Sequence, residues 1–262
     1  MTTASAHALE VEQVSLGIGE VRILEDVSLR VSWGGATGLI GANGSGKSSL
    51  LNVVSGYYRP TQGEVRIQGN VTTGLRPDQV CARGVGRSFQ SIGRMQDLTV
   101  REYVALGLEP TWGSSRFGSL FGLPGSRKAE RAAFAKADDL IGDFGVADYA
   151  GSLLKNCPYG VRKITDLLRA VISEPTVLLL DEPTSGVAAS DRRTIAELIR
   201  RWRDRSSCAV VLVDHDVAFV AEIADELVAL SAGRVVDSGS PEQVMANPKV
   251  LATFVGEGEK DA

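Results

Sequence analysis

Apolar and polar residues alternate in two parts of the N-terminal third of the chain, and both stretches predict half-buried β-strands. Within residues 9–40, Val27, Leu29 and Val31 alternate with polar neighbours, and a Gly-Gly pair then marks a turn. Residues 63–70 (GEVRIQGN) alternate in the same way and end on a Gly-Asn pair that favours a turn. We therefore expect β-structure in this part of the chain.

Three other stretches are apolar almost throughout, as in strands of a parallel sheet that is covered on both faces. They are TGLIG (37–41), TVLLLD (176–181) and CAVVLVDHD (208–216). A helix that begins near Lys47 follows the first stretch, and a helix near 190–205 separates the other two. A strand near 227–233 and a short tail helix complete the pattern. This alternation of strands and helices predicts an α/β protein.

The middle of the chain, residues 91–160, is expected to be mostly helical. Residues 113–126 (GSSRFGSLFGLPGS) are rich in Gly and Ser, which predicts a mobile connector. Ser126 is expected to cap the next helix, which Gly145 ends. The apolar stripe of that helix consists of Phe134, Ala137, Ile141 and Phe144. Because this block interrupts the α/β pattern, we interpret it as a subdomain inserted into one domain.

Length and composition exclude several classes of protein. With 262 residues, the chain is long enough for one large domain or one domain with lobes. Its net charge of −4 argues against a general nucleic-acid binder. We expect neither a membrane span nor a signal peptide, because long apolar runs and a basic start are missing. The 3 scattered cysteines are typical of reduced thiols in a cytosolic protein, not of disulfides or a zinc site.

The stretch GANGSGKSS (41–49) has the spacing of a phosphate-binding loop between a strand and a helix. Its glycines allow backbone N–H groups to point at phosphate oxygens, and the helix adds its positive N-terminal end. Lys47 would contact the β- and γ-phosphates, and Ser48 would offer a hydroxyl ligand to Mg²⁺. The expected nucleotide-binding residues are Gly41, Asn43, Gly44, Ser45, Gly46, Lys47, Ser48 and Ser49. The alternative, a chance Gly-rich turn, fits the flanking strand and helix poorly.

Two acidic residues, Asp181 and Glu182, follow the apolar stretch that begins at residue 176. Asp181 would hold Mg²⁺ through its water shell, and Glu182 would polarise the attacking water. Phosphoryl transfer depends mainly on positioning and charge neutralisation, so one carboxylate on the metal and one on the water suffice. An acidic turn after a core strand is the alternative, and the phosphate-binding loop upstream favours the catalytic interpretation.

Gln90 and His215 are further candidate residues. The Gln90 amide, in RSFQS, would reach Mg²⁺ or the water and report the nucleotide state to a neighbour. A polar surface Gln is the alternative. His215, in VDHD, follows a strand at the sheet edge where ligands bind, so it would contact the γ-phosphate and help to orient the water. A lone His is more often structural, which is the alternative here.

These motifs, in this order, resemble the ATP-binding subunit of ABC transporters over about residues 9–256. The matching elements are GANGSGKSS (41–49), SFQ (88–90), the signature position CPYGV (157–161), LLLDEP (178–183) and His215. The resemblance implies a P-loop NTPase (RecA-like) α/β core with an N-terminal antiparallel β subdomain and an inserted α-helical subdomain. It also implies an ATPase that uses ATP and Mg²⁺. Its dimers would hold each ATP between the phosphate-binding loop of one chain and the signature of the other.

On this basis residues 1–262 form a single ATP-binding domain with four parts. The parts are about 9–87 (β subdomain and phosphate-loop region), 91–160 (helical subdomain with the signature position), 161–240 (rest of the core) and 241–262 (C-terminal tail).

Other details are similar to the subfamily that serves importers of branched-chain amino acids and related compounds. They are SGYYRPTQGEV (55–65), GRSFQ…LTVREYV (86–104), the insertion near 113–126, Tyr159 and the ending GSPEQVMANPKVLATFVGEG (239–258). This similarity implies transmembrane permease subunits and a secreted or periplasmic substrate-binding protein as partners. It also implies a peripheral place on the cytoplasmic face of the membrane.

The chain departs from the family pattern at three places. Family members usually stack an aromatic residue on adenine where this chain has Ile18, which would pack on the base without π-stacking. The loop after the acidic pair, through which the two sites of a dimer communicate, ends in Ala188 where members often have Asp. The signature position keeps Tyr159 and Gly160, but Pro158 replaces its Ser and Val161 replaces its Gln.

The changed signature suggests an unlike partner. A hydroxyl bond to phosphate is worth ~1.5–3 kcal/mol, so its loss weakens a site on the order of 10- to 100-fold. Residues Pro158, Tyr159 and Gly160 would act in trans, so the weakened site belongs to the partner's nucleotide. The chain's own catalytic candidates are intact. We therefore favour a heterodimer with a second ATP-binding subunit over a homodimer.

Two other functions remain open. Pro158 favours a regulatory subunit that holds nucleotide with little turnover, whereas the presence of Glu182 and His215 argues against it. A non-transport ABC ATPase of DNA repair or translation is disfavoured, because the chain has neither coiled coils nor zinc hooks and only one cassette. Import is favoured over export because no membrane span is fused to the chain. The substrate could be a branched-chain amino acid, an amide, urea, or a small organic or aromatic acid.

Overall fold

The N-terminal strands form an antiparallel sheet. The computed structural model describes residues 6–88, 93–111 and 124–255. Strands β1 (His7–Ile18), β2 (Val21–Ser32), β4 (Gln62–Ile67) and β5 (Asn70–Val71) pair in the order β2-β1-β4-β5. Val27, Leu29 and Val31 are buried, as their alternation predicts. The antiparallel β subdomain that the resemblance implies is therefore present.

A second sheet forms the centre of the molecule. It consists of β3 (Ala36–Ile40), β6 (Val85–Arg87), β7 (Val177–Asp181), β8 (Ala209–Val213), β9 (Glu226–Ser231) and β10 (Arg234–Gly239). The strand order is β10-β9-β3-β8-β7-β6, and every neighbouring pair is parallel except β9 with β10. The sequence pattern did not predict β10.

The central strands are covered on both faces, as their apolar sequences predict. Leu178 and Leu180 of β7 belong to a cluster with the helical subdomain and the helices on that side, whereas Val177 and Leu179 belong to a cluster with the antiparallel sheet. Helix α1 (Lys47–Val54) packs within the second cluster, between the two sheets. Helices α7 (Ala189–Ser206) and α8 (Val217–Ile223) pack within the first.

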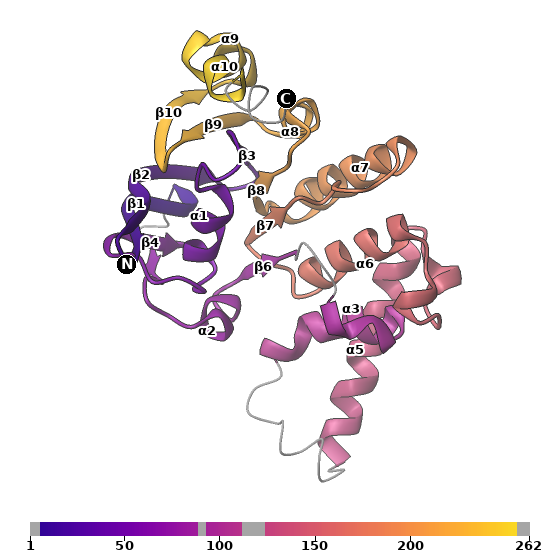
Figure 1. Ribbon diagram of the computed structural model, residues 1–262. Coiled ribbons are helices and arrows are strands. Elements are labelled where there is room, and N and C mark those ends of the chain that lie inside the picture. The colour runs from indigo at the N-terminus through magenta and orange to yellow at the C-terminus, as the bar shows by residue number, and fades with distance from the viewer. Residues whose placement is uncertain (1–5, 89–92, 112–123, 256–262) are drawn as a thin grey trace.

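The remaining helices form an inserted block and a tail (Figure 1). The block contains α3 (Val100–Ala105), α5 (Pro124–Asp143), α6 (Tyr159–Val171) and the 3₁₀ turns Gly93–Asp97, Leu106–Thr111, Ala147–Tyr149 and Leu154–Asn156. Helix α2 (Pro77–Cys81) precedes β6. The tail has two short helices, α9 (Pro241–Ala246) and α10 (Pro248–Val255), where one was expected.

One boundary in the block was predicted wrongly. Helix α5 begins at Pro124, so Ser126 lies inside its first turn and does not precede it as a cap. Proline suits a first helical turn because its fixed φ is helical and it needs no donor there. The helix ends before Gly145, whose φ of 72° is left-handed, as predicted. Most of the connector at 113–126 lies outside the described residues.

Buried hydrogen bonds connect the helical block to the central sheet. The Tyr103 hydroxyl donates to Asp166 Oδ1 at 2.8 Å, and Arg169 Nη2 donates to the same oxygen at 3.1 Å. Arg169 Nη2 also donates to the carbonyl oxygen of Arg87, the last residue of β6, at 2.8 Å. Burial and the Asp166 carboxylate both raise the pKa of Tyr103. These bonds join α3, α6 and β6 into one unit.

Candidate active site

The loop between β3 and α1, which the sequence predicts to bind phosphate, follows a backbone path that depends on its glycines. Gly41, Gly44 and Gly46 have φ angles of 143°, 74° and 106°, which residues with a Cβ rarely adopt. A Cβ on Gly41 would also lie 2.1 Å from the carbonyl oxygen of Leu230. The glycines are therefore needed for the path of this loop. Helix α1 begins directly at Lys47 and points its N-terminus into the loop.

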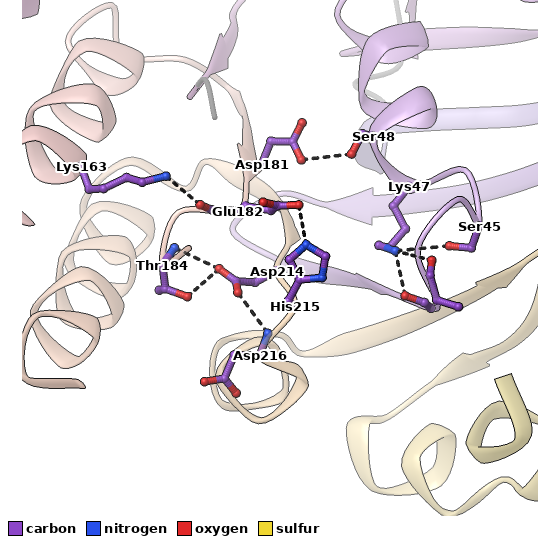
Figure 2. Close-up of polar contacts among 12 residues, drawn as sticks. Ser45, Lys47, Ser48, Lys163, Asp181, Glu182, Thr184, Asp214, His215 and Asp216 are labelled. Atoms are coloured by element: carbon purple, nitrogen blue, oxygen red, sulfur yellow. Dashed lines mark hydrogen bonds and ion pairs between the residues drawn. The ribbon is translucent and has the colours of Figure 1, made fainter. Parts of the chain in front are cut away.

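The Lys47 side chain folds back across the loop (Figure 2). Its Nζ donates to the carbonyl oxygens of Gly41 at 2.7 Å and Ala42 at 2.8 Å, and to Ser45 Oγ at 3.4 Å. The loop thus holds an ammonium group beside backbone N–H groups at a helix start. That combination attracts an anion with several oxygens, such as a phosphate chain.

Ser48 and Asp181 meet at the edge of the central sheet. Ser48 Oγ donates to Asp181 Oδ1 at 3.3 Å, although 133 residues separate them in sequence. A hydroxyl beside a carboxylate supplies the hard oxygen ligands that Mg²⁺ prefers. In the described ranges no group of three or more His, Cys, Asp or Glu is placed to hold a metal. This donor set fits Mg²⁺, which keeps several waters and binds substrate phosphates, better than an ion that needs a full protein cage.

Glu182 and His215 form a pair beside that edge. Glu182 Oε1 lies 2.8 Å from His215 Nε2 (Figure 2), and 13% of the Glu182 side chain and 56% of the His215 side chain is exposed. Their elements are adjacent because β7 pairs with β8. The carboxylate is thus shielded, while the imidazole remains accessible to a ligand. This geometry suits proton transfer from water to the Glu182 carboxylate, which the solvent-accessible His215 side chain holds in place.

A buried carboxylate joins the two loops that contain this pair. Asp214 Oδ2 accepts hydrogen bonds from the Thr184 backbone N–H at 3.0 Å and from Thr184 Oγ1 at 2.7 Å. Asp214 Oδ1 accepts from the Asp216 N–H at 3.1 Å, and Asp216 Oδ1 in turn accepts from the Phe219 N–H and caps α8. The sequence pattern does not indicate Asp214 or Thr184. One signal is present, because the stretch VDHD (213–216) has an acidic residue on each side of His215.

Arg87 is a third residue of this region that the sequence pattern did not indicate. Its Nη2 lies 3.2 Å from Asp181 Oδ2, and its Nη1 donates to Asn52 Oδ1 at 2.8 Å and Ser55 Oγ at 2.6 Å. The guanidinium therefore bridges the carboxylate of β7 and the end of α1. The opposite oxygen of Asp181 remains directed at Ser48.

The signature position lies at the start of α6. Pro158 is the N-cap residue, with φ −53° and ψ 151°, and it makes no side-chain capping bond. Gly160 is buried in the first turn, and the Tyr159 hydroxyl donates to the Ser185 carbonyl oxygen at 3.0 Å. Tyr159 thus contacts the loop after β7, and the role of these residues in trans stays a prediction.

The last two predicted site residues are Ile18, for which the structure shows only a position, and Gln90, which it does not describe. Ile18 lies at the end of β1, opposite Val21, and both are exposed at the tip of the hairpin. A Cβ on Gly46 would touch Leu24 of the same hairpin, so this strand pair borders the phosphate-binding loop. Gln90 lies outside the described residues, so its role stays a prediction.

The family model described as ABC transporter matches residues 24–185. The chain is 28% identical over 253 residues to the high-affinity branched-chain amino acid transport ATP-binding protein BraF of Pseudomonas aeruginosa, covering 97% of this chain and 99% of that protein. It is 34% identical to the sulfate/thiosulfate import ATP-binding protein CysA of Mycolicibacterium paratuberculosis, covering 95% of this chain and 64% of that protein. A crystal structure of a nucleotide-free ATP-binding cassette from an ABC transporter superposes with a TM-score of 0.83 at 26% identity, covering 95% of this chain and 98% of that one. Within residues 6–88, 93–111 and 124–255, no helix has the length and apolar character needed to cross a membrane.

Proposed function

The chain belongs to the ABC transporter family of ATP-binding subunits, which hydrolyse ATP with Mg²⁺ to power transport, and we propose which of its residues perform each step. The residues 41–49 bind the phosphates through backbone N–H groups and Lys47. Ser48, Asp181 and Gln90 would hold Mg²⁺. Bound Mg²⁺ neutralises charge on the phosphate oxygens.

Glu182 is proposed to polarise the attacking water, with His215 holding its carboxylate and contacting the γ-phosphate. The observation that supports these roles is the 2.8 Å contact between Glu182 and His215, next to the Asp181–Ser48 pair. A shielded carboxylate with one oriented neighbour is suited to accept a proton from a water in line with a phosphate.

Glutamate-to-glutamine substitutions test this assignment. Removal of a general base lowers turnover about 10²- to 10⁴-fold, so Glu182→Gln should lower kcat by that factor and leave ATP binding intact. Glu174→Gln is the matched control, because Glu174 is an exposed acid that pairs with Lys136 at 2.6 Å. Unchanged turnover in Glu182→Gln would exclude Glu182 as the base.

We further propose that the chain powers an importer from the cytoplasmic face of the membrane. Support comes from the names of similar proteins, which describe branched-chain amino acid transport and sulfate/thiosulfate import. The proposed partners are transmembrane permeases and a secreted or periplasmic binding protein, and the proposed substrates are branched-chain amino acids or similar small polar or organic-acid compounds. Copurified permeases, followed by ATP-driven uptake of labelled leucine or sulfate into vesicles, would test direction and substrate.

A heterodimer with a second ATP-binding subunit is the proposed assembly. Pro158 supports it, because this residue has no side-chain donor for a phosphate of the partner's nucleotide, whereas Ser48 bonds to Asp181 and Glu182 pairs with His215 in this chain. The positive end of α6 would still attract that phosphate. Turnover of the assembled transporter should therefore fall much more with Glu182→Gln here than with the equivalent change in the partner. Equal losses would contradict the asymmetry.

The alternative of a regulatory subunit that only holds nucleotide is also supported by Pro158. Lys47→Ala in the purified complex separates the two functions. Lost ATPase activity supports an active subunit, and unchanged activity supports the regulatory one.

Adenine is proposed to pack on the exposed Ile18 side chain. Ile18→Ser would weaken ATP binding without a change in kcat.

A further inference from the structure

The backbone of Glu182 has an unusual conformation. Its φ of 52° lies in the left-handed region, which residues with a Cβ rarely adopt. Such a conformation persists where neighbouring contacts hold it, and it is often found at functional sites. The direction of the Glu182 carboxylate follows from this conformation, because φ determines where the side chain leaves the main chain.

Several contacts surround this residue. The Glu182 N–H donates to the Val213 carbonyl oxygen at 2.8 Å, and the carboxylate pairs with His215. The third contact comes from a different element. Lys163 Nζ, from α6, donates to the Glu182 carbonyl oxygen at 3.0 Å (Figure 2), and the Ser185 N–H donates to the same oxygen at the longer distance of 3.3 Å. The N–H and the carbonyl group on the two sides of the Glu182 Cα are therefore both held.

The ammonium group of Lys163 lies in a partly buried position near an aromatic ring. The side chain is half-buried, and Nζ lies 5.8 Å from the centroid of the Tyr159 ring, which attracts a cation. The Tyr159 hydroxyl in turn bonds to Ser185, in the same loop as Glu182. A charged donor forms a stronger hydrogen bond than a neutral one, and its partial burial strengthens it further.

We propose that Lys163 is a positioning residue for Glu182. Its ammonium holds the left-handed peptide that directs the carboxylate toward His215, so Lys163 acts on turnover without touching the nucleotide. The inference rests on the proposed role of Glu182. It also connects the helix that begins at the signature position with this chain's own catalytic carboxylate.

A stability experiment tests the positioning directly and does not depend on catalysis. In the unmodified chain, loss of Lys163 lets Glu182 relax from its strained φ and recover part of the cost, whereas glycine adopts a left-handed φ without strain and recovers nothing. Lys163→Met should therefore lower the urea midpoint more in the Glu182→Gly background than in the unmodified chain. In the Glu182→Ala background, which lacks the carboxylate but keeps a Cβ, the loss should be as large as in the unmodified chain. Glu174→Gly is the matched control, because Glu174 also has a left-handed φ of 54° and does not bond to Lys163. Equal losses in all four backgrounds would overturn the proposal.

Turnover of the assembled transporter tests the consequence. A misplacement of about 1 Å can lower a rate by as much as 10²-fold, so Lys163→Met should lower kcat ~10- to 100-fold with an unchanged KM for ATP. Lys163→Arg, which keeps a charged donor, should restore most of kcat. Lys136→Met, which removes an exposed lysine bonded to Glu174, should have no effect. Lys163→Met should also have no further effect in the Glu182→Gln background.

The outcomes separate the two ideas. If Glu182→Gln retains turnover, the proposed role of Glu182 fails, while the stability experiment still tests Lys163. If Glu182→Gln abolishes turnover and Lys163→Met leaves kcat unchanged, the positioning role of Lys163 is wrong and the role of Glu182 stands.

Discussion

Arg87 and Asp181 form an ion pair of 3.2 Å between the ends of two adjacent parallel strands. Only 12% of the Arg87 side chain and 10% of the Asp181 side chain is exposed. Loss of one partner of such a buried pair leaves the other charge without its compensation. The pair fixes the carboxylate that faces Ser48, and removal of one partner alone should destabilise the fold.

Arg87→Gln should lower the free energy of unfolding by about 3–5 kcal/mol, because Asp181 is then left buried without its cation. Urea titration measures this change. Arg30→Gln is the control: Arg30 pairs with Glu12 at 3.3 Å, but both side chains are largely exposed, so less than about 1 kcal/mol should be lost. A loss in Arg87→Gln as small as in the control would show that the pair contributes little.

Gly160→Ala should destabilise the chain for a steric reason. A Cβ at this position would lie 2.4 Å from Asp191 Oδ2 and 3.0 Å from Asp191 Cγ. Overpacking of this kind costs about 1–3 kcal/mol, although alanine is usually favoured over glycine in a helix by about 0.5–1 kcal/mol.

The clash should disappear in the Asp191→Ala background, where Gly160→Ala is expected to be neutral or stabilising. The four thermal unfolding curves of this double-mutant cycle isolate the effect of the pair. If Gly160→Ala has the same effect with and without Asp191, the contact does not determine the choice of glycine.

Ala188→Asp should stabilise helix α7. Ala188 is exposed and has the extended backbone of an N-cap residue, with φ −62° and ψ 153°, but it offers no side-chain acceptor. A capping residue in place of alanine contributes about 0.5–2 kcal/mol. Ala188→Asn should give a similar gain because the hydrogen bond dominates. A gain for Asp alone would instead attribute the effect to charge at the helix N-terminus, and no gain for either would contradict the assignment of Ala188 as the cap.

The buried thiol of Cys208 should make the folded protein less stable in alkaline solution. Burial raises the pKa of its thiol from 9.0 to about 12, so the folded state disfavours the thiolate. The unfolded chain releases this proton above pH 9 and the folded chain does not. The contribution of the neutral thiol is therefore complete below pH 9 and is lost as the pH rises toward 12, by about 1.4 kcal/mol per pH unit.

Comparison with Cys208→Ala isolates this effect. The buried Tyr103, whose pKa is also raised, contributes equally in both proteins, so it cancels in the difference. Between pH 9 and 11 the free energy of unfolding should fall more steeply in the unmodified chain. Parallel curves for the two proteins would exclude Cys208 as the source.

The features that sequence predicted well are those written in contiguous residues. The strands β7 and β8 are short apolar runs buried on both faces, and residues 41–49 combine Gly spacing with a strand and a helix. The boundary at Ser126 was wrong because two signals competed, a hydroxyl side chain and a proline two residues earlier. Strand β10 was missed because its partly exposed residues give only a weak alternation.

Arg87 and Lys163 were not predicted for a different reason. Arg87 and Lys163 act through partners 94 and 19 residues away, and each is an ordinary basic residue in its own segment. Their roles arise from strand order and helix placement, which local patterns do not encode. The left-handed φ of Glu182 likewise depends on neighbours from other elements, so the local sequence does not predict it.

The bonds that run from Tyr103 through Asp166 and Arg169 to the Arg87 carbonyl, and from the Arg87 guanidinium to Asp181, have a mechanical consequence. If α3 and α6 rotate against the central sheet, either the Arg169–Arg87 bond breaks or the end of β6 moves with the helices. In the second case the Asp181 carboxylate is displaced relative to Ser48. The angle of the helical block and the shape of the proposed Mg²⁺ site would then vary together, as a single degree of freedom.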